Sequence, residues 1–248
     1  MSGNSYDGFF IGWGKKLPKG LSGFLIVVSL FMVGLFAGTA FSFVVSQDDP
    51  GDGAFRGRQN VTGVMQAAPY PVVHIPPGDK YPNGHSIMLS GGGKRGVQNQ
   101  AEPLDGQVVQ VRGALLKRGD LDMIQVGRRI QAVKDSTPHE VETTSLGRWK
   151  LSGEICDGKC YAGAMRPGKG LAHKACANLC LIGGVPAIFV SSGPVDGSIF
   201  FMLADADGKA LGDRLYDMTA VLLSAEGEIE KRGDLHLFKI DLDSVEVQ

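Results

Sequence analysis

The chain has 248 residues, of which 25 are Lys or Arg, 26 are Asp or Glu and 43% are apolar. This balance excludes a protein whose overall charge would draw it to nucleic acid or to an acidic surface. It is ordinary for a globular protein that also carries one membrane segment, and the remaining ~200 residues are enough for one or two domains.

The first predicted element is an apolar segment without charge, from Leu21 to Ser46, rich in Leu, Ile, Val and Phe. Because about 20 helical residues cross a bilayer core, we predict a transmembrane helix over 21–46. Three lysines precede the segment and two aspartates follow it: Lys15, Lys16, Lys19, Asp48 and Asp49. The positive-inside bias then predicts that residues 1–20 form a cytoplasmic arm and that the rest lies outside the cytoplasm.

A cleaved signal peptide is the alternative, since small residues of the kind that flank cleavage sites occupy 37–40. The apolar core of a signal peptide usually has only about 7–15 residues, which is shorter than this segment. We therefore favour an uncleaved anchor.

Residues 47–60 are rich in Gly, Asp and Pro and lack periodicity, which predicts a linker. Beyond it, short runs rich in β-branched residues alternate with Gly, Pro and Asp turns, which is an all-β signature. The predicted strands are 61–65, 70–75, 86–90, 107–116, 121–126, 130–133, 148–155, 187–191, 198–203, 219–229 and 235–240.

A sequence repeat relates the two halves of this region. The pattern Gly-x-x-x-Lys-Arg-Gly-Asp-Leu at 113–121 recurs at 227–235, an offset of 114 residues (227 − 113). Each Lys-Arg-Gly-Asp predicts a hairpin turn whose Gly adopts the left-handed conformation. We therefore predict a mainly all-β fold with two tandem OB-like small β-barrels, at 61–135 and 148–247.

The second unit is longer, because Val-Thr-Gly at 61–63 matches Leu-Ser-Gly at 151–153 with an offset of only 90 (153 − 63). The extra residues of the second unit are predicted to form a Cys-rich helical insertion at 156–182, which contains every cysteine of the chain. A helix over 171–181 would place its His and two Cys on one face. The candidate site residues are Cys156, Cys160, His173, Cys176 and Cys180.

Three chemistries compete for these residues. An even cysteine count outside the cytoplasm favours disulfides, and i, i+4 neighbours on a helix have nearly parallel Cβ vectors, so bridges should join the pair Cys156 and Cys160 to the pair Cys176 and Cys180. The same thiolates with His173 suit zinc or copper, although C-x-x-x-C is not the common C-x-x-C spacing. A redox-active dithiol is the third alternative. We favour the disulfides, and on that interpretation expect no cofactor.

The run Leu-Ser-Gly-Glu-Ile-Cys-Asp-x-x-Cys from residue 151, followed by His-x-x-Cys-x-x-x-Cys and by Gly-Gly-x-Pro-Ala-Ile-Phe-Val, resembles a widespread bacterial group of small extracytoplasmic Cys-containing domains. The resemblance covers about 148–247. It implies an OB-like fold and an extracytoplasmic location rather than an activity. Cys160 departs from the group's pattern and would complete a second bridge.

Other motifs carry weaker signals. The glycine-rich run 91–96 lacks the Ser or Thr of a phosphate loop, so we predict a hairpin tip there. The first barrel is locally basic, but the aromatic residues that would stack on bases are nearly missing from it, so we expect no nucleic acid. The basic residues are Lys94, Arg95, Arg112, Lys117, Arg118, Arg128 and Arg129.

Because no catalytic constellation can be recognised from spacing, we expect a non-enzymatic accessory or binding protein. It would be anchored in the bacterial inner membrane by a single helix, with a cytoplasmic N-terminus and periplasmic C-terminal domains. Its expected partners are the membrane itself and another membrane or periplasmic protein, such as a membrane redox or transport complex. The alternative is a thiol- or metal-handling redox protein that acts through the Cys/His segment.

Overall fold

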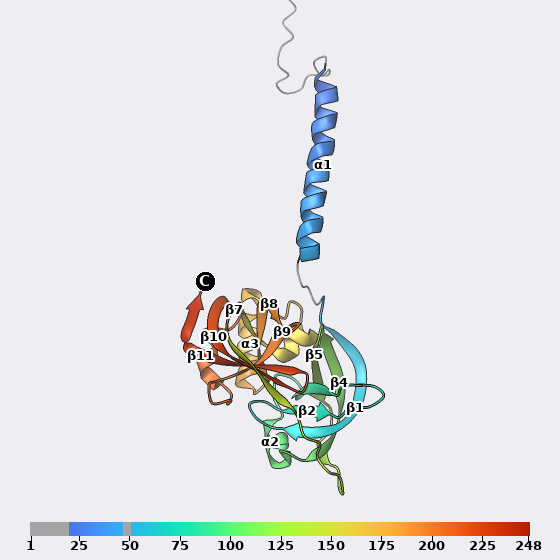
Figure 1. The fold of residues 1–248 in the computed structure, drawn as a ribbon, viewed down its shortest axis with the longest axis vertical. Helices are drawn as coiled ribbons and strands as arrows, with labels where there is room; N and C mark the ends of the chain where they lie inside the picture. The colour runs from blue at the N-terminus through green and yellow to red at the C-terminus, as the bar shows by residue number, and fades with distance from the viewer. Residues whose placement is uncertain (1–19, 47–50) are drawn as a thin grey trace, which may run out of the picture. The chain divides into compact units, whose positions relative to one another are not determined.

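The computed structural model describes residues 20–46 and 51–248 (Figure 1). The chain divides into two units, an N-terminal one that contains helix α1 (Leu21–Ser46) and a C-terminal body that begins at residue 50. The body is mostly β-structure. The predicted mainly β fold with one N-terminal apolar helix is confirmed.

Helix α1 has 26 residues, which at 1.5 Å per residue gives a length of about 39 Å. It is long and apolar enough to cross a membrane. Its large apolar side chains are exposed, Phe31 at 67% for example. The predicted helix over 21–46 is confirmed, while residues 1–19 of the predicted cytoplasmic arm lie outside the described residues.

The first sheet closes on itself. Its ring order is β1-β2-β3-β5-β4, and β4 pairs back to β1, so the prediction of a closed β-barrel is confirmed. β3 and β5 run parallel, whereas the other neighbours in the ring are antiparallel. The strands are β1 (Ala54–Gln66), β2 (Val72–Ile75), β3 (His85–Ser90), β4 (Val108–Arg118), β5 (Leu121–Val126) and the short β6 (Gln131–Ala132), which extends the sheet beside β4.

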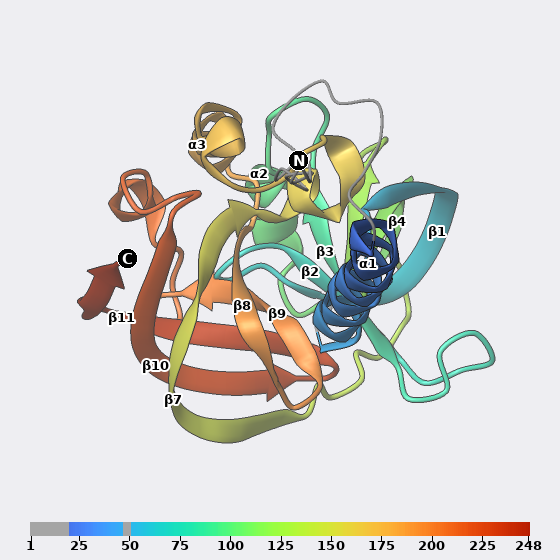
Figure 2. The ribbon, with the colours of Figure 1, turned by 90° about the horizontal axis from the view of Figure 1, so that it is seen from above.

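The second sheet is a closed barrel with the corresponding order, β7-β8-β9-β11-β10. β9 and β11 form its parallel pair. Figure 2 shows these strands curving around a common interior beside the first barrel. They are β7 (Thr143–Asp157), β8 (Ala187–Val195), β9 (Ser198–Ala204), β10 (Leu222–Arg232) and β11 (Leu235–Val247).

Matching sequence motifs occupy matching places in the two barrels. The turn glycines Gly119 and Gly233 have φ angles of +58° and +61°, as predicted for the Lys-Arg-Gly-Asp turns. In the parallel pairs, Met88 lies opposite Met123 and Met202 lies opposite Leu237. The same offset of 114 residues therefore relates both members of each pair (202 − 88 and 237 − 123).

The predicted linker 47–60 is too long. Residues 54–60 form the first half of β1 and pair with 112–117 of β4, and residues 47–50 lie outside the described residues. This half of β1 is mostly exposed, so it lacks the buried apolar alternation by which a strand is recognised in a sequence.

The two barrels pack together as one body. A single buried cluster contains Phe189, Phe201 and Phe238 of the second barrel together with Met88 and Met123 of the first. A second cluster fills the interior of the first barrel alone. The first barrel therefore contributes one set of apolar side chains to its own core and another to the interface.

The Cys-rich segment connects β7 to β8. It contains two short helical turns, η2 (Cys160–Ala164) and η3 (Leu171–His173), and helix α3 (Lys174–Ile182), so the helix predicted over 171–181 is present with a tighter first turn. The predicted insertion 156–182 starts too early, because Cys156 belongs to β7 and pairs with Ile188. The short elements α2 (Gln98–Ala101), η1 (Glu102–Leu104) and η4 (Gly212–Leu215) were not predicted.

Candidate thiol site

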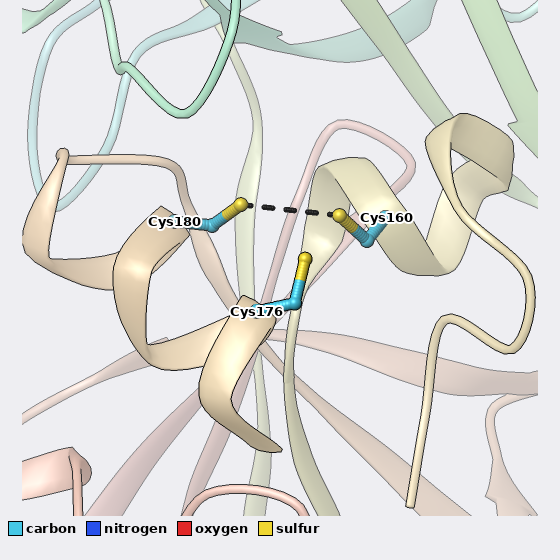
Figure 3. A group of neighbouring side chains, drawn as sticks. All are labelled: Cys160, Cys176 and Cys180. Atoms are coloured by element: carbon cyan, nitrogen blue, oxygen red, sulfur yellow. Dashed lines mark hydrogen bonds between the residues drawn. The ribbon is translucent and has the colours of Figure 1, made fainter. Parts of the chain in front are cut away.

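Three cysteines converge between η2 and α3 (Figure 3). The Sγ atoms of Cys160, Cys176 and Cys180 all lie within 4.8 Å of one another. Sγ of Cys160 is 3.9 Å from Sγ of Cys180. Cys160 and Cys180 are buried and Cys176 is half-buried, so the cluster reaches the surface on the side of Cys176.

Helical periodicity and a glycine turn explain how the segment gathers these thiols. Cys176 and Cys180 are four residues apart on α3, so both point from one face of the helix. The helix ends at Ile182 with Gly183 as its C-cap, and Val185 then turns back to donate its N–H to the carbonyl of Cys180 at 3.0 Å. Val185 is buried against Cys160 and Cys180, which fixes α3 against η2.

A buried carboxylate and imidazole lie on the other side of Cys160. Nε2 of His173 is 3.1 Å from Oδ2 of Asp157, and because a carboxylate only accepts, Nε2 carries the proton. The backbone N–H of Cys160 donates to Oδ1 of Asp157 at 2.8 Å. Ligand atoms of Asp157, Cys160 and His173 also lie within 4.8 Å of one another, so Cys160 belongs to both groups.

Two lysines connect the site to the first barrel. Nζ of Lys94, in the loop 91–96 after β3, lies 2.7 Å from Sγ of Cys176 and 3.9 Å from Sγ of Cys180. The ammonium of Lys159 donates to the carbonyls of Gly91 and Gly93 at 2.7 and 2.6 Å. The loop of the first barrel thus places a positive charge beside the thiols of the second.

Close backbone approach holds this loop against the end of α3. The N–H of Gly96 donates to the carbonyl of Gly183 at 2.7 Å. A Cβ atom at Gly183 would lie only 1.7 Å from the carbonyl oxygen of Lys94, so only glycine fits there. The prediction of a hairpin tip at 91–96 is wrong, since β3 runs parallel to β5 and the loop leads into α2.

The thiols differ in acidity. The hydrogen bond between Cys160 and Cys180 lowers the pKa of Cys180 and raises the pKa of Cys160, and the charge of Lys94 lowers the pKa of Cys180 further. The hydrogen bond to Cys176 raises the pKa of Lys94, which keeps this ammonium charged. Cys180 therefore ionises before Cys160, with the proton of Cys160 and the ammonium of Lys94 stabilising its thiolate.

The structure brings together part of the predicted site. All four cysteines are free thiols, so the predicted disulfides are not present in this structure. Cys156 lies outside the cluster; its thiol donates to Glu154 at 3.2 Å, and burial raises its pKa well above the ordinary value. Because its side chain is buried in the same apolar cluster as Phe189, Cys156 behaves as a small apolar core residue. His173 lies beside Asp157 and Cys160.

Sequence reasoning missed Asp157, Lys159 and Lys94. The first two stand inside the Cys-rich run, where polar residues between cysteines were the available signal. Lys94 is 82 positions from Cys176 and belongs to the other barrel, so no local pattern indicates its role.

Comparisons of the chain with protein-family models, with curated proteins and with solved structures found no match.

Proposed function

We propose that this chain is a membrane-anchored protein that binds a soft metal ion, zinc or copper(I), through the thiolates of Cys160, Cys176 and Cys180. The convergence of three sulfur atoms within 4.8 Å is the observation that carries the proposal. Thiolate sulfur is the ligand that such ions prefer.

The distances between the sulfur atoms support a bound metal ion more than a disulfide. Metal–sulfur bonds of about 2.3 Å place neighbouring thiolates roughly 3.7–4.0 Å apart in tetrahedral or trigonal sites. The distance of 3.9 Å between Sγ of Cys160 and Sγ of Cys180 falls in that range. A disulfide would bring the two atoms to about 2.05 Å.

The surroundings suit a thiolate-bound cation. The charge of Lys94 lowers the pKa of Cys180, which favours the deprotonated form that a metal ion requires. Asp157 and His173 form a buried pair against Cys160, of the kind that orients ligands around metal sites. His173 is the nearby side chain suited to complete a fourth coordination position.

Metal analysis combined with thiol counting tests the proposal on the full chain purified from membranes in mild detergent. We expect about one zinc or copper ion per chain, lost in Cys176→Ser and retained in the matched control Cys156→Ser, whose thiol lies outside the cluster. Metal-free protein in which Cys160 and Cys180 are blocked as a disulfide would refute metal binding. That result would support the redox or structural dithiol instead.

For the fold, we propose that both barrels are OB-like and arose as a duplication, with the Cys-rich segment inserted between the first two strands of the second copy. The corresponding strand orders and the shared offset of 114 residues support this. An OB-like barrel is a five-stranded Greek-key barrel.

For the location, we propose that α1 spans the bacterial inner membrane once, with the N-terminus in the cytoplasm and the barrels in the periplasm. The length and apolar surface of α1 and the three lysines that precede it support this topology. Reporter fusions at the C-terminus and protease accessibility in spheroplasts test it. A C-terminal reporter active only in the cytoplasm would refute it.

A second candidate function is the accessory role expected from the sequence, in which the tethered body serves a membrane redox or transport complex. An anchor combined with two barrels that are joined by a common buried cluster favours a rigid binding module. Crosslinking in intact membranes followed by gentle solubilisation should recover a membrane or periplasmic protein partner. Recovery of only uncrosslinked monomer would count against this role.

A further inference from the structure

The first barrel carries a groove of about 500 Å³ whose lining includes none of the residues of the thiol site. It lies where β1, β4 and the end of β5 meet. Its lining residues are Arg58, Gln59, Asn60, Arg112, Gly113, Ala114, Gln125, Gly127 and Arg128. Three arginines and no carboxylate are among them.

The charge of this groove is uncompensated. In the described part of the chain, none of Arg58, Arg112 and Arg128 forms an ion pair with a carboxylate. Other basic residues of the first barrel do have partners. Lys117 pairs with Asp122 at 2.8 Å, and Arg118 lies over the ring of Tyr161 at 4.1 Å.

Neutral contacts position the cations. Nε of Arg112 donates to Oδ1 of Asn60 at 3.3 Å, which holds this guanidinium while leaving its outer N–H groups free for an anion. Nζ of Lys80 donates to Oε1 of Gln59 at 2.8 Å and brings a further ammonium to the rim. Gly113 and Gly127 line the groove between the long side chains.

We infer that this groove binds an organic phosphate. Guanidinium forks match the oxygens of a phosphate group, and three of them around one groove suit an anion with several peripheral oxygens. A volume of about 500 Å³ exceeds that of a lone phosphate and is typical of sites for whole small molecules. The phosphate is carried either by a lipid headgroup or by a small soluble ester.

Calorimetric titration of the full chain in phosphatidylcholine nanodiscs tests this. The probes are glycerol 3-phosphate, a short-chain phosphatidylglycerol and, as a non-phosphate dianion, succinate. We expect a phosphate probe to bind, and Arg112→Gln and Arg128→Gln each to weaken it about tenfold or more, since hydrogen bonds to charged groups are among the stronger ones.

Arg129→Gln is the matched control, because it removes the same charge next to Arg128 but lies outside the groove lining. Its affinity should stay within about twofold of the wild type, since a lone exposed charge contributes little. Binding of phosphatidylglycerol alone assigns the headgroup as the source, and binding of glycerol 3-phosphate assigns a soluble ester. Equal binding of succinate, equal losses in all three variants, or no binding of either phosphate probe would overturn the inference.

Discussion

At the scale of single residues, the thiol site divides one type of side chain into three environments. Cys156 is a core residue, Cys160 is a buried hydrogen-bond donor, and Cys180 is the thiol whose ionisation its neighbours favour. The spacing of the four cysteines in the sequence predicts that all of them belong to one site. The difference comes from burial and from Lys94, which a local pattern does not reveal.

Replacement of Cys160 by Ser should change the acidity of Cys180. The C–O bond of Ser is shorter than the C–S bond of Cys, so the hydroxyl lies farther from Sγ of Cys180. The hydrogen bond that lowers the pKa of Cys180 is then weakened. In the metal-free, reduced full chain, thiolate absorbance in the ultraviolet should then rise at a higher pH than in the wild type. Cys156→Ser should leave this first ionisation where it is, and an equal displacement in both variants would contradict the assignment.

Lys159 is the second residue whose role is local and testable. Lys159→Met leaves the carbonyls of Gly91 and Gly93 without their donor, which should lower the free energy of unfolding by about 2 kcal/mol or more. Lys150→Met is the control, because Lys150 is exposed and only pairs with Glu246 at 3.5 Å; it should change stability by less than about 1 kcal/mol. Urea unfolding measures both, and equal effects would argue against a structural role for Lys159.

At the scale of elements, most strands lie where the sequence predicts them, whereas the first half of β1 was not predicted. Strands such as β5 and β9 bury most of their residues between turn signals, so their composition identifies them. Residues 54–60 form a strand because β4 supplies a pairing edge, not because of their own apolar pattern.

Close strand packing gives a prediction at this scale. A Cβ atom at Gly153 in β7 would lie 2.2 Å from the carbonyl oxygen of Val190 in β8, whereas one at Gly193 would meet nothing within 4 Å. Gly153→Ala should therefore lower the free energy of unfolding by about 1–3 kcal/mol. Gly193→Ala should stay within about 0.5 kcal/mol of the wild type. Thermal unfolding of both variants measures the difference, and comparable values would show that β7 can move away from β8.

At the scale of the whole molecule, His85 joins the two barrels. Its Nε2 lies 2.9 Å from Oδ2 of Asp122 in the first barrel and its Nδ1 lies 2.5 Å from Oδ2 of Asp234 in the second. Burial lowers the pKa of His85, but the hydrogen bonds and charges of the two carboxylates outweigh burial and raise the pKa to about 9. No local sequence pattern indicates this role, since Asp122 and Asp234 lie 37 and 149 positions from His85 in the chain.

The raised pKa makes the stability of the body depend on pH. A group whose folded pKa exceeds its unfolded value stabilises the fold below the unfolded pKa, here 6.5, and this contribution is lost as pH rises through about 9. The thermal midpoint of the wild type should therefore fall as the pH is raised from 6.5 to 9. The free energy of unfolding should decrease by at most about 3 kcal/mol over the same range. His85→Gln should start lower at pH 6.5 and decline less, and a parallel decline in both proteins would rule out His85 as the cause.

The sequence by itself determined the apolar helix, the positions of most strands along the chain and the Gly turns of the two repeated motifs, because these depend on periodicity and composition within short stretches of chain. It also placed the cysteines in one segment. Only the tertiary structure decided that Cys156 leaves that group, that Lys94 joins it and that His85 bridges the barrels. Those contacts form between residues far apart in the chain, so they depend on how the two closed barrels pack, which no local pattern encodes.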